Sequence, residues 1–208
     1  MRLEIGIIAL LEEVIGKPAE KRAQFDWLCN KPYRKHFGEY YDVLMELYRH
    51  LQGDWKGTSQ KSHGHLTPDA YFSEPYNFIF EFDELQHFTR YRKETFRFYP
   101  KNIPLAYETE VYIEFCRQQH VAALAKGPDR FRRPTADFPY INGRAAQRAF
   151  FDTFRDWLPT QHGLNPTVRL TEFEVTPILN GTLTGNDAKD FMEQLIKKRL
   201  AIPNQRVQ

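Results

Sequence analysis

The chain has 208 residues, of which 41% are hydrophobic and 27% are charged, and its formal net charge is +2. This composition is typical of a soluble globular protein, and the length is that of one domain with a substantial hydrophobic core. The small net charge excludes a protein that binds nucleic acid through overall positive charge alone. We therefore expect a single domain over residues 1–208, in which any basic surface is local.

The cysteines and the N-terminal segment bear on the location of the protein. Cys29 and Cys116 are isolated and form no C-x-x-C pair, so we interpret them as free thiols in a reducing compartment. The apolar stretch at residues 1–16 is interrupted by three glutamates and is too short to span a bilayer. We expect a cytoplasmic protein without a membrane segment.

The first half of the chain combines helices with two strands. Helical periodicity and helix-ending residues predict helices at residues 3–15, 19–29 and 39–51. The polar segment 54–67 is expected to be a loop or a short strand. Strands are predicted at 69–72 and 78–82, with a turn near Pro75 between them. The second strand is almost continuously apolar, which predicts a central strand covered on both faces.

The second half of the chain is mainly helical. Helices are predicted at residues 105–125, 144–158 and 187–201. A loop rich in Pro, Gly and Arg at 127–143 separates the first two, and alternating apolar residues predict a strand at 167–175.

This order of elements predicts an α/β fold in which a small mixed β-sheet is flanked by helices. We divide the domain into an N-terminal helical segment (1–38), a core (39–176) and a C-terminal helix (177–208).

Acidic side chains surround the apolar strand. Glu81 lies in this strand and Asp83 directly follows it, two residues beyond Glu81, so strand periodicity places both on one face. If the turn near Pro75 forms a hairpin, Asp69 faces Glu81 across neighbouring strands. Three converging carboxylates need a counter-charge, and Mg²⁺ or Mn²⁺ suits oxygen ligands. The sequence therefore predicts a metal bound by Asp69, Glu81 and Asp83, able to promote attack on a phosphodiester.

The sequence PD before the hairpin and FIFEFD in its second strand resemble the signature of the PD-(D/E)xK nuclease superfamily. Within that superfamily, EFDELQH is similar to the E-x-D-G-x-x-H pattern of the Vsr-like (very-short-patch-repair) endonuclease group, which adds Gln86 and His87 to Glu81 and Asp83. The resemblance covers residues 68–87. It implies a restriction-endonuclease-like core and Mg²⁺-dependent hydrolysis of DNA, with Asp69, Glu81, Asp83, Gln86 and His87 as the catalytic residues.

Two positions depart from this pattern. Asp83 stands where the superfamily usually has a lysine that positions the attacking water, and Glu84 stands where the Vsr-like group has glycine. A register that uses Glu84 and Gln86 would imitate an E-x-Q variant, but Glu84 lies beyond the end of the apolar strand. Without the lysine, His87 becomes the candidate general base and Gln86 helps to place the water.

Basic and amide side chains in three segments are expected to contact nucleic acid: Arg90, Arg92, Arg132, Arg133, Arg144, Gln147 and Arg148. Arg144 and Arg148 are four residues apart on a predicted helix, so both guanidinium groups can bind phosphate oxygens. The alternative is an ordinary charged helix surface, on which the arginines pair with Asp152 and Asp156.

We therefore expect a Mg²⁺-dependent endonuclease, or one that uses Mn²⁺, which acts on DNA in restriction, antiphage defence or repair. A homodimer would allow so small a nuclease to cut both strands. A catalytically inactive nuclease fold that binds nucleic acid or a protein partner is the main alternative, and the missing lysine favours it. A hydrolase of small phosphoesters is a weaker one.

Overall fold

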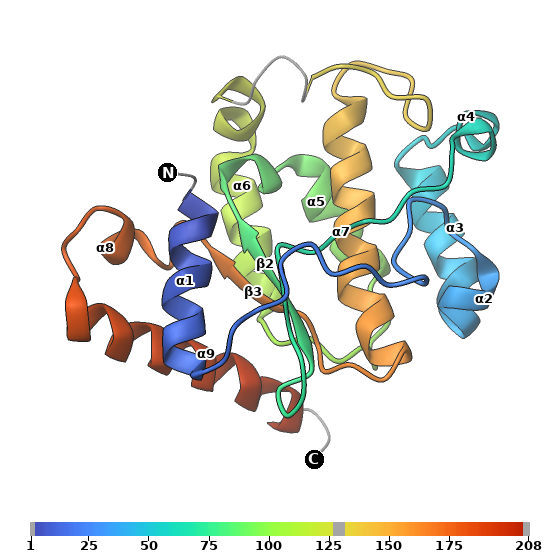
Figure 1. Ribbon diagram of the computed structural model, residues 1–208. Helices are drawn as coiled ribbons and strands as arrows, with labels where there is room; N and C mark the ends of the chain where they lie inside the picture. The colour runs from blue at the N-terminus through green and yellow to red at the C-terminus, as the bar shows by residue number, and fades with distance from the viewer. Residues whose placement is uncertain (1–2, 127–131, 206–208) are drawn as a thin grey trace.

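A mixed three-stranded sheet lies at the centre of the computed structural model, which describes residues 3–126 and 132–205 (Figure 1). The middle strand is β2 (Phe78–Asp83), which pairs antiparallel with β1 (Ala70–Phe72) and parallel with β3 (Val168–Thr171). Helices flank the sheet on both sides. The predicted fold class, α/β with a small mixed sheet between helices, is therefore confirmed.

One face of the sheet is apolar and packs against the first and last helices. Phe78, Phe80 and Phe82 of β2 point to this face, because alternate residues of a strand point in the same direction. There they join the buried side chains of α1 (Leu3–Ile15) and α9 (Gly185–Gln205), which lie side by side in Figure 1. The two ends of the chain therefore cover the same face.

The opposite face carries the charged side chains of the strands. Glu81 and Asp83 alternate with the phenylalanines and point to this face, as does Arg169, the parallel partner of Glu81 in β3. Three helices cover this face: the short α5 (Arg90–Thr95) and the longer α6 (Thr109–Lys126) and α7 (Gly143–Gln161). All of β2 is buried, as its apolar run predicts for a strand covered on both faces.

Short helices complete the chain. Those that precede the sheet lie beyond α7 in Figure 1: α2 (Arg34–Phe37), the 3-10 helix η1 (Gly38–Tyr40), α3 (Tyr41–His50) and α4 (Trp55–Gln60). Three others connect larger elements: η2 (Leu85–His87), η3 (Phe96–Phe98) and α8 (Thr176–Leu179). Buried apolar side chains of α3 and α7 belong to the same core.

The apolar N-terminal segment forms α1, as predicted. Its Ile7, Ile8 and Leu11 are buried and pack in the core on the α9 side of the sheet. Within the described ranges, no helix is both long enough and apolar enough to cross a membrane.

The segment 19–29 is not the helix that its sequence predicts. Glu20 exchanges two backbone hydrogen bonds with Tyr71, with N···O distances of 2.8 and 2.9 Å, so the chain meets the outer edge of β1 at this residue, and Cys29 forms a second isolated bridge with His65. A free strand edge carries unsatisfied N–H and C=O groups, and pairing with that edge stabilises the extended conformation over a helix. Segment 54–67 differs too, because it contains α4, whose N-cap Asp54 accepts a hydrogen bond from the N–H of Lys56.

Strand β3 and helix α7 end at positions other than those predicted. The strand expected at 167–175 ends at Thr171, whose N–H donates to the Glu174 carboxylate while its hydroxyl accepts from the N–H of Glu174. This local turn removes the residues after Thr171 from the sheet. Helix α7 continues through Pro159, which has no N–H for the carbonyl of Arg155, and the Thr167 hydroxyl donates to that carbonyl instead.

Candidate active site

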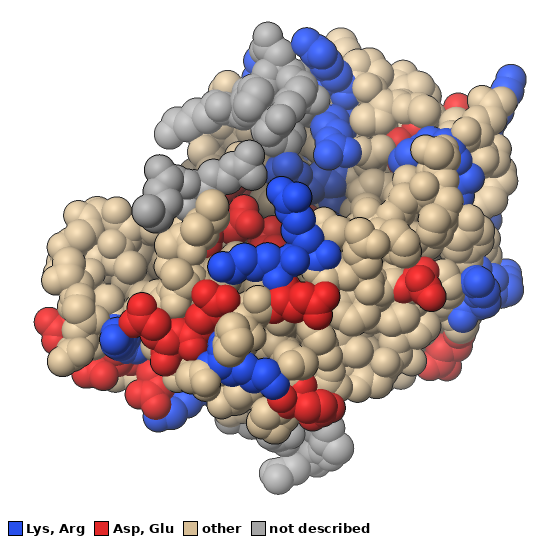
Figure 2. All heavy atoms as spheres, in the orientation of Figure 1, with Lys and Arg blue, Asp and Glu red and all other residues tan. Residues whose placement is uncertain are grey.

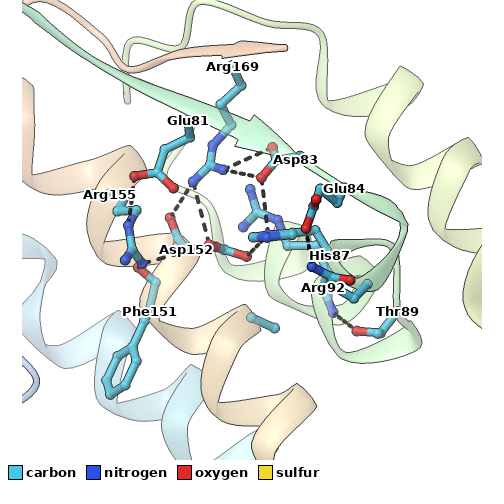
Figure 3. A network of polar contacts seen from close by, with 12 residues as sticks. Glu81, Asp83, Glu84, His87, Thr89, Arg92, Phe151, Asp152, Arg155 and Arg169 are labelled. Atoms are coloured by element: carbon cyan, nitrogen blue, oxygen red, sulfur yellow. Dashed lines mark hydrogen bonds and ion pairs between the residues drawn. The ribbon is translucent and has the colours of Figure 1, made fainter. Parts of the chain in front are cut away.

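A pocket of about 450 Å³ lies on the charged face of the sheet, between the end of the β1–β2 hairpin and α7. The hairpin contributes Asp69 and Glu81 to its walls, η2 contributes His87, and α7 contributes Asp152 and Arg155. Figure 3 shows the side chains of Glu81, Asp152 and Arg155 directed toward one another between β2 and α7. The fold therefore gathers acidic, basic and imidazole groups in one cavity.

Asp69 and Glu81 face each other at the open end of the hairpin, away from its turn. The antiparallel register pairs Ala70 with Phe80, which places Asp69 opposite Glu81 with both side chains on one face. Burial raises the pKa of Asp69, although a hydrogen bond of 2.8 Å from the N–H of Phe82 opposes the shift. Burial also raises the pKa of Glu81 well above its usual value, and the charge of Asp69 adds to this shift. For both carboxylates the effect of burial on the pKa outweighs that of the nearby positive charge, a combination that is common at functional sites.

Arg155 supplies part of the counter-charge for Glu81. Its Nε lies 2.9 Å from Oε1 of Glu81, so the two groups form an ion pair. The two atoms are not aligned for a hydrogen bond, and neither atom has a hydrogen-bond partner among the described residues. The charge of Arg155 lowers the pKa of Glu81, but by less than burial raises it. Oε1 of Glu81 therefore has capacity to bind a ligand in the pocket.

Asp83, the expected third metal ligand, does not line the pocket. Its two oxygens accept hydrogen bonds of 2.9 and 3.0 Å from Nη1 of Arg169, and Oδ2 also accepts one of 2.9 Å from the Tyr112 hydroxyl. The protein itself therefore supplies the counter-charge of this buried carboxylate. Asp83, the third acidic residue of the motif, therefore belongs to a buried ion pair with Arg169 and not to the pocket wall.

His87 forms the wall of the pocket next to Asp83 and Asp152. Its Nδ1 lies 3.1 Å from Oδ2 of Asp152, in hydrogen-bonding geometry, and 3.1 Å from Oδ1 of Asp83. The contacts of the ring with Asp152 and Asp83 are both made by Nδ1, and His87 lines the pocket. Gln86 lines the pocket too, and its amide donates to the carboxylate of Glu84.

Behind the pocket, the buried carboxylate of Asp156 forms ion pairs with two buried arginines, Arg92 and Arg169. Figure 3 labels both arginines. Nε of Arg169 donates to Oδ1 of Asp156 and Nη2 of Arg92 donates to Oδ2, both at 2.7 Å. Burial alone would raise the pKa of Asp156, but the two arginines hold it below its usual value. Arg92 is only 1% exposed, which corrects the expectation that it contacts nucleic acid. A buried carboxylate requires such a partner.

Arg144 and Arg148 line the pocket from α7. Figure 2 shows Lys and Arg side chains bordering a hollow over the N-terminal part of this helix. Burial lowers the pKa of Arg148 to about 10, while the charge of Asp152 opposes the shift, so the guanidinium stays cationic at neutral pH. The two residues predicted to bind phosphate from one helix therefore face the carboxylate pair across one cavity.

The other residues predicted to contact nucleic acid do not line this pocket. Gln147 is buried, and its amide donates to the carboxylate of Asp137, so it is an interior residue. This corrects the expected surface position, because most of the circumference of α7 is buried. Arg90 and Arg133 are exposed. Arg132 donates to a carbonyl in the last turn of α6.

The carboxylates of Asp69 and Glu81 are the candidate ligands for a divalent cation in this pocket, and they would not surround the ion by themselves. Across the described parts of the chain, no group of three or more His, Cys, Asp or Glu side chains could hold a metal ion. Mg²⁺ commonly keeps several waters and binds through one or two carboxylates together with phosphate oxygens of a substrate. Asp69 and Glu81 fit this mode, because both carboxylates have raised pKa values and Oε1 of Glu81 lacks a hydrogen bond.

Three site residues were not predicted from the sequence: Asp152, Arg155 and Arg169. Arg169 interrupts the apolar residues of a buried strand, and an arginine in such a position must be paired with an acid. Asp152 follows Arg148 by four residues and precedes Arg155 by three, so these side chains share one helix face. The alternative of Arg–Asp pairs on this helix already included Asp152, but the sequence does not indicate that Asp152 contacts His87 or that Arg169 contacts Asp83 and Asp156.

Residues 46–133 of the chain match a family of unknown function, DUF7255. The match includes the hairpin with Asp69 and Glu81 and the segment with His87, and it ends before α7 and β3. It spans less than half of the chain. No curated protein and no solved structure matches the chain.

Proposed function

We propose that the protein is a Mg²⁺-dependent nuclease that hydrolyses phosphodiester bonds of DNA. The observation that carries the proposal is the pair of buried carboxylates, Asp69 and Glu81, facing each other in a pocket that Arg144 and Arg148 line from α7. Carboxylates that bind a cation, beside guanidinium groups that bind phosphate oxygens, are what hydrolysis of a phosphodiester requires.

Each group has a role that follows from its place in the pocket. Asp69 and Glu81 would hold Mg²⁺ or Mn²⁺, which when bound polarises the phosphoryl oxygen and favours formation of hydroxide. Arg144 and Arg148 bind the non-bridging oxygens and orient the phosphodiester. Gln86 lines the same pocket, where it would help to place the attacking water.

The proposal is tested by incubating plasmid DNA with the purified protein in Mg²⁺, Mn²⁺ or a chelator. We expect nicking that requires the metal, and a loss of about a hundredfold or more in Asp69→Ala and Glu81→Ala, because loss of a group that only supports a metal ligand already costs about 10–100-fold. Glu46→Gln, an exposed carboxylate on α3, is the matched control and should keep full activity. Nicking that survives both alanine substitutions would contradict the proposed site.

Metal binding has a readout that does not depend on cleavage. A ligand that binds the folded state stabilises it by RT ln(1 + [L]/Kd). Thermal unfolding of the wild type should therefore shift to higher temperature as Mg²⁺ is added, whereas Asp69→Ala should show no such shift. Equal shifts in both proteins would place the metal elsewhere.

A second candidate function is a nuclease-like module that binds DNA without cutting it. Asp83, at the position of the usual lysine, is held by Arg169 and Tyr112, which supports this alternative. DNA binding that weakens steeply with salt, together with no cleavage in any metal, would favour the binding module.

We also propose a cytoplasmic location. Cys29 and Cys116 are buried free thiols, which supports a reducing compartment. A nuclease there would act in restriction, antiphage defence or repair. Survival of cells with and without the gene, after phage infection or DNA damage, separates these roles.

A further inference from the structure

We propose that Asp152 positions His87 as the general base of this hydrolysis, with Nε2 as the proton acceptor. The proposal rests on the nuclease function and adds a positioning residue from α7 to the groups of the hairpin. It is carried by the geometry of three side chains: His87 on η2, Asp152 on α7 and Asp83 at the end of β2.

Asp152, and not Asp83, is the hydrogen-bond partner of the imidazole. Both carboxylates have an oxygen 3.1 Å from Nδ1, but the geometry of a hydrogen bond is met only toward Oδ2 of Asp152. The oxygens of Asp83 already accept from Arg169 and Tyr112. Asp83 therefore confines the ring from one side, while Oδ2 of Asp152 accepts a hydrogen bond from Nδ1–H.

The surroundings of Asp152 keep its carboxylate ionised. Burial by itself would raise the pKa of Asp152, but cationic His87 and its hydrogen bond, followed by Arg169 and Arg92, hold it well below its usual value. The two arginines keep their charge when the imidazole is neutral, so they stabilise the carboxylate in the state in which His87 acts as a base. Arg155 and Arg169 each lie 3.9 Å from Oδ1, which has no hydrogen bond among the described residues. An ionised acceptor at Nδ1 fixes the tautomer with Nδ1–H and leaves the lone pair on Nε2.

The position of the ring suits proton transfer in the pocket. His87 lines the same cavity as Asp69, Glu81 and Arg148. Nε2 takes a proton from a water molecule as the water oxygen forms a bond to phosphorus and the bond from phosphorus to the ester oxygen breaks. The leaving oxygen takes a proton from solvent, and Nε2 later returns its proton to solvent. The products are a phosphate monoester and an alcohol.

Asp152→Asn tests the role of Asp152 in turnover. We expect kcat to fall by about 10²–10⁴-fold with KM nearly unchanged, because the asparagine no longer fixes the tautomer and does not touch the substrate. Asp152→Glu should recover part of the activity. Glu174→Gln makes the same chemical change at a carboxylate that pairs with Arg199 and does not line the pocket, and it should keep kcat. An Asp152→Asn enzyme with wild-type kcat would overturn the proposal.

A second measurement separates this proposal from the nuclease function. Nitrogen-15 NMR at a pH where imidazole is neutral reports which nitrogen of His87 carries the proton. The wild type should show Nδ1–H and a bare Nε2, and Asp152→Asn should lose this preference. If no DNA is cut in any metal, the nuclease function fails, while the Nδ1–H tautomer would still support the His87–Asp152 pair. An Nε2–H tautomer in the wild type would overturn the pair, whatever the activity.

Discussion

Buried charged residues in this protein are of two kinds: those fully paired with opposite charges and those only partly paired. Behind the pocket, Arg169 contacts Asp83 and Asp156 at hydrogen-bonding distance and is fully buried. At the pocket, Asp69 and Glu81 are buried with less positive charge than they need, and Arg155 offsets only part of it. The ion pairs of Arg169 hold the residues behind the pocket in place, whereas Asp69 and Glu81 are left able to bind a positively charged ligand.

Arg169→Met should destabilise the fold strongly. The substitution leaves two buried carboxylates, Asp83 and Asp156, without their shared counter-charge, so we expect a loss of about 3–5 kcal/mol in the free energy of unfolding, measured with urea. Arg117→Met is the matched control, because Arg117 forms an exposed ion pair with Glu114, and its effect should stay below about 1 kcal/mol. Equal losses in the two variants would show that the buried pairs are not important for stability.

Asp69→Asn should stabilise the protein at neutral pH. Because burial raises the pKa of Asp69 in the fold, its contribution to stability is present below the unfolded pKa and is lost as pH rises through the folded pKa. Asparagine removes the charge and still accepts from Phe82, so the variant should gain about 0.5–2 kcal/mol at pH 7, as removal of a functional charge often does. The gain should vanish near pH 3, and Asp26→Asn, at an exposed aspartate, should show neither effect.

At the scale of elements, α7 connects the pocket to the rest of the fold. Its first residue, Gly143, approaches the carbonyl oxygen of Phe138 so closely that a Cβ atom would lie 1.9 Å from it. Arg144 and Arg148 follow directly on this helix. The close approach therefore fixes where the basic wall of the pocket begins.

Two glycine substitutions test this element. Gly143→Ala should cost about 1–3 kcal/mol of stability, because the backbone must move to accept the methyl group. It should also weaken DNA binding by displacing Arg144. Gly6→Ala in α1 is the matched control: its Cβ meets no atom within 4 Å, so the variant should gain about 0.5–1 kcal/mol from helix propensity. Unfolding by urea measures both, and a neutral Gly143→Ala would contradict the close packing.

At the scale of the whole molecule, positive charge is concentrated locally, while the net charge stays small. The net charge is only +2, yet Figure 2 shows basic side chains concentrated beside a hollow over α7. Binding of DNA would therefore depend on a few local phosphate contacts rather than on a general field.

The salt dependence of DNA binding tests this distribution. Arg144→Ala and Arg148→Ala should each reduce the slope of log K against log salt by about 1, since each removes one phosphate contact. Fluorescence anisotropy without divalent metal measures the slope, and Arg117→Ala on α6 is the control that should leave it unchanged. Slopes equal to that of the wild type in both variants would place the DNA on another surface.

Local patterns of the sequence were sufficient for the elements that periodicity determines. Helix α1, most of α3 and the two strands of the hairpin lie where apolar spacing predicts them, and the hairpin register follows from the turn between its strands. Such patterns failed where a distant segment decided the outcome. The segment 19–29 is not helical, and its Glu20 pairs with Tyr71 of β1, while α7 passes through Pro159 because Thr167 satisfies the carbonyl of Arg155.

The sequence by itself determined that Asp69 and Glu81 share a face at the end of a buried hairpin, because strand alternation and turn position are local properties. Only the tertiary structure decided which charges meet. It turned Asp83 to Arg169, buried Arg92 against Asp156, and brought Asp152 of α7 to His87. A buried charge must find a partner, but the chain does not show which of many opposite charges lies within 3 Å until helices and sheet have packed.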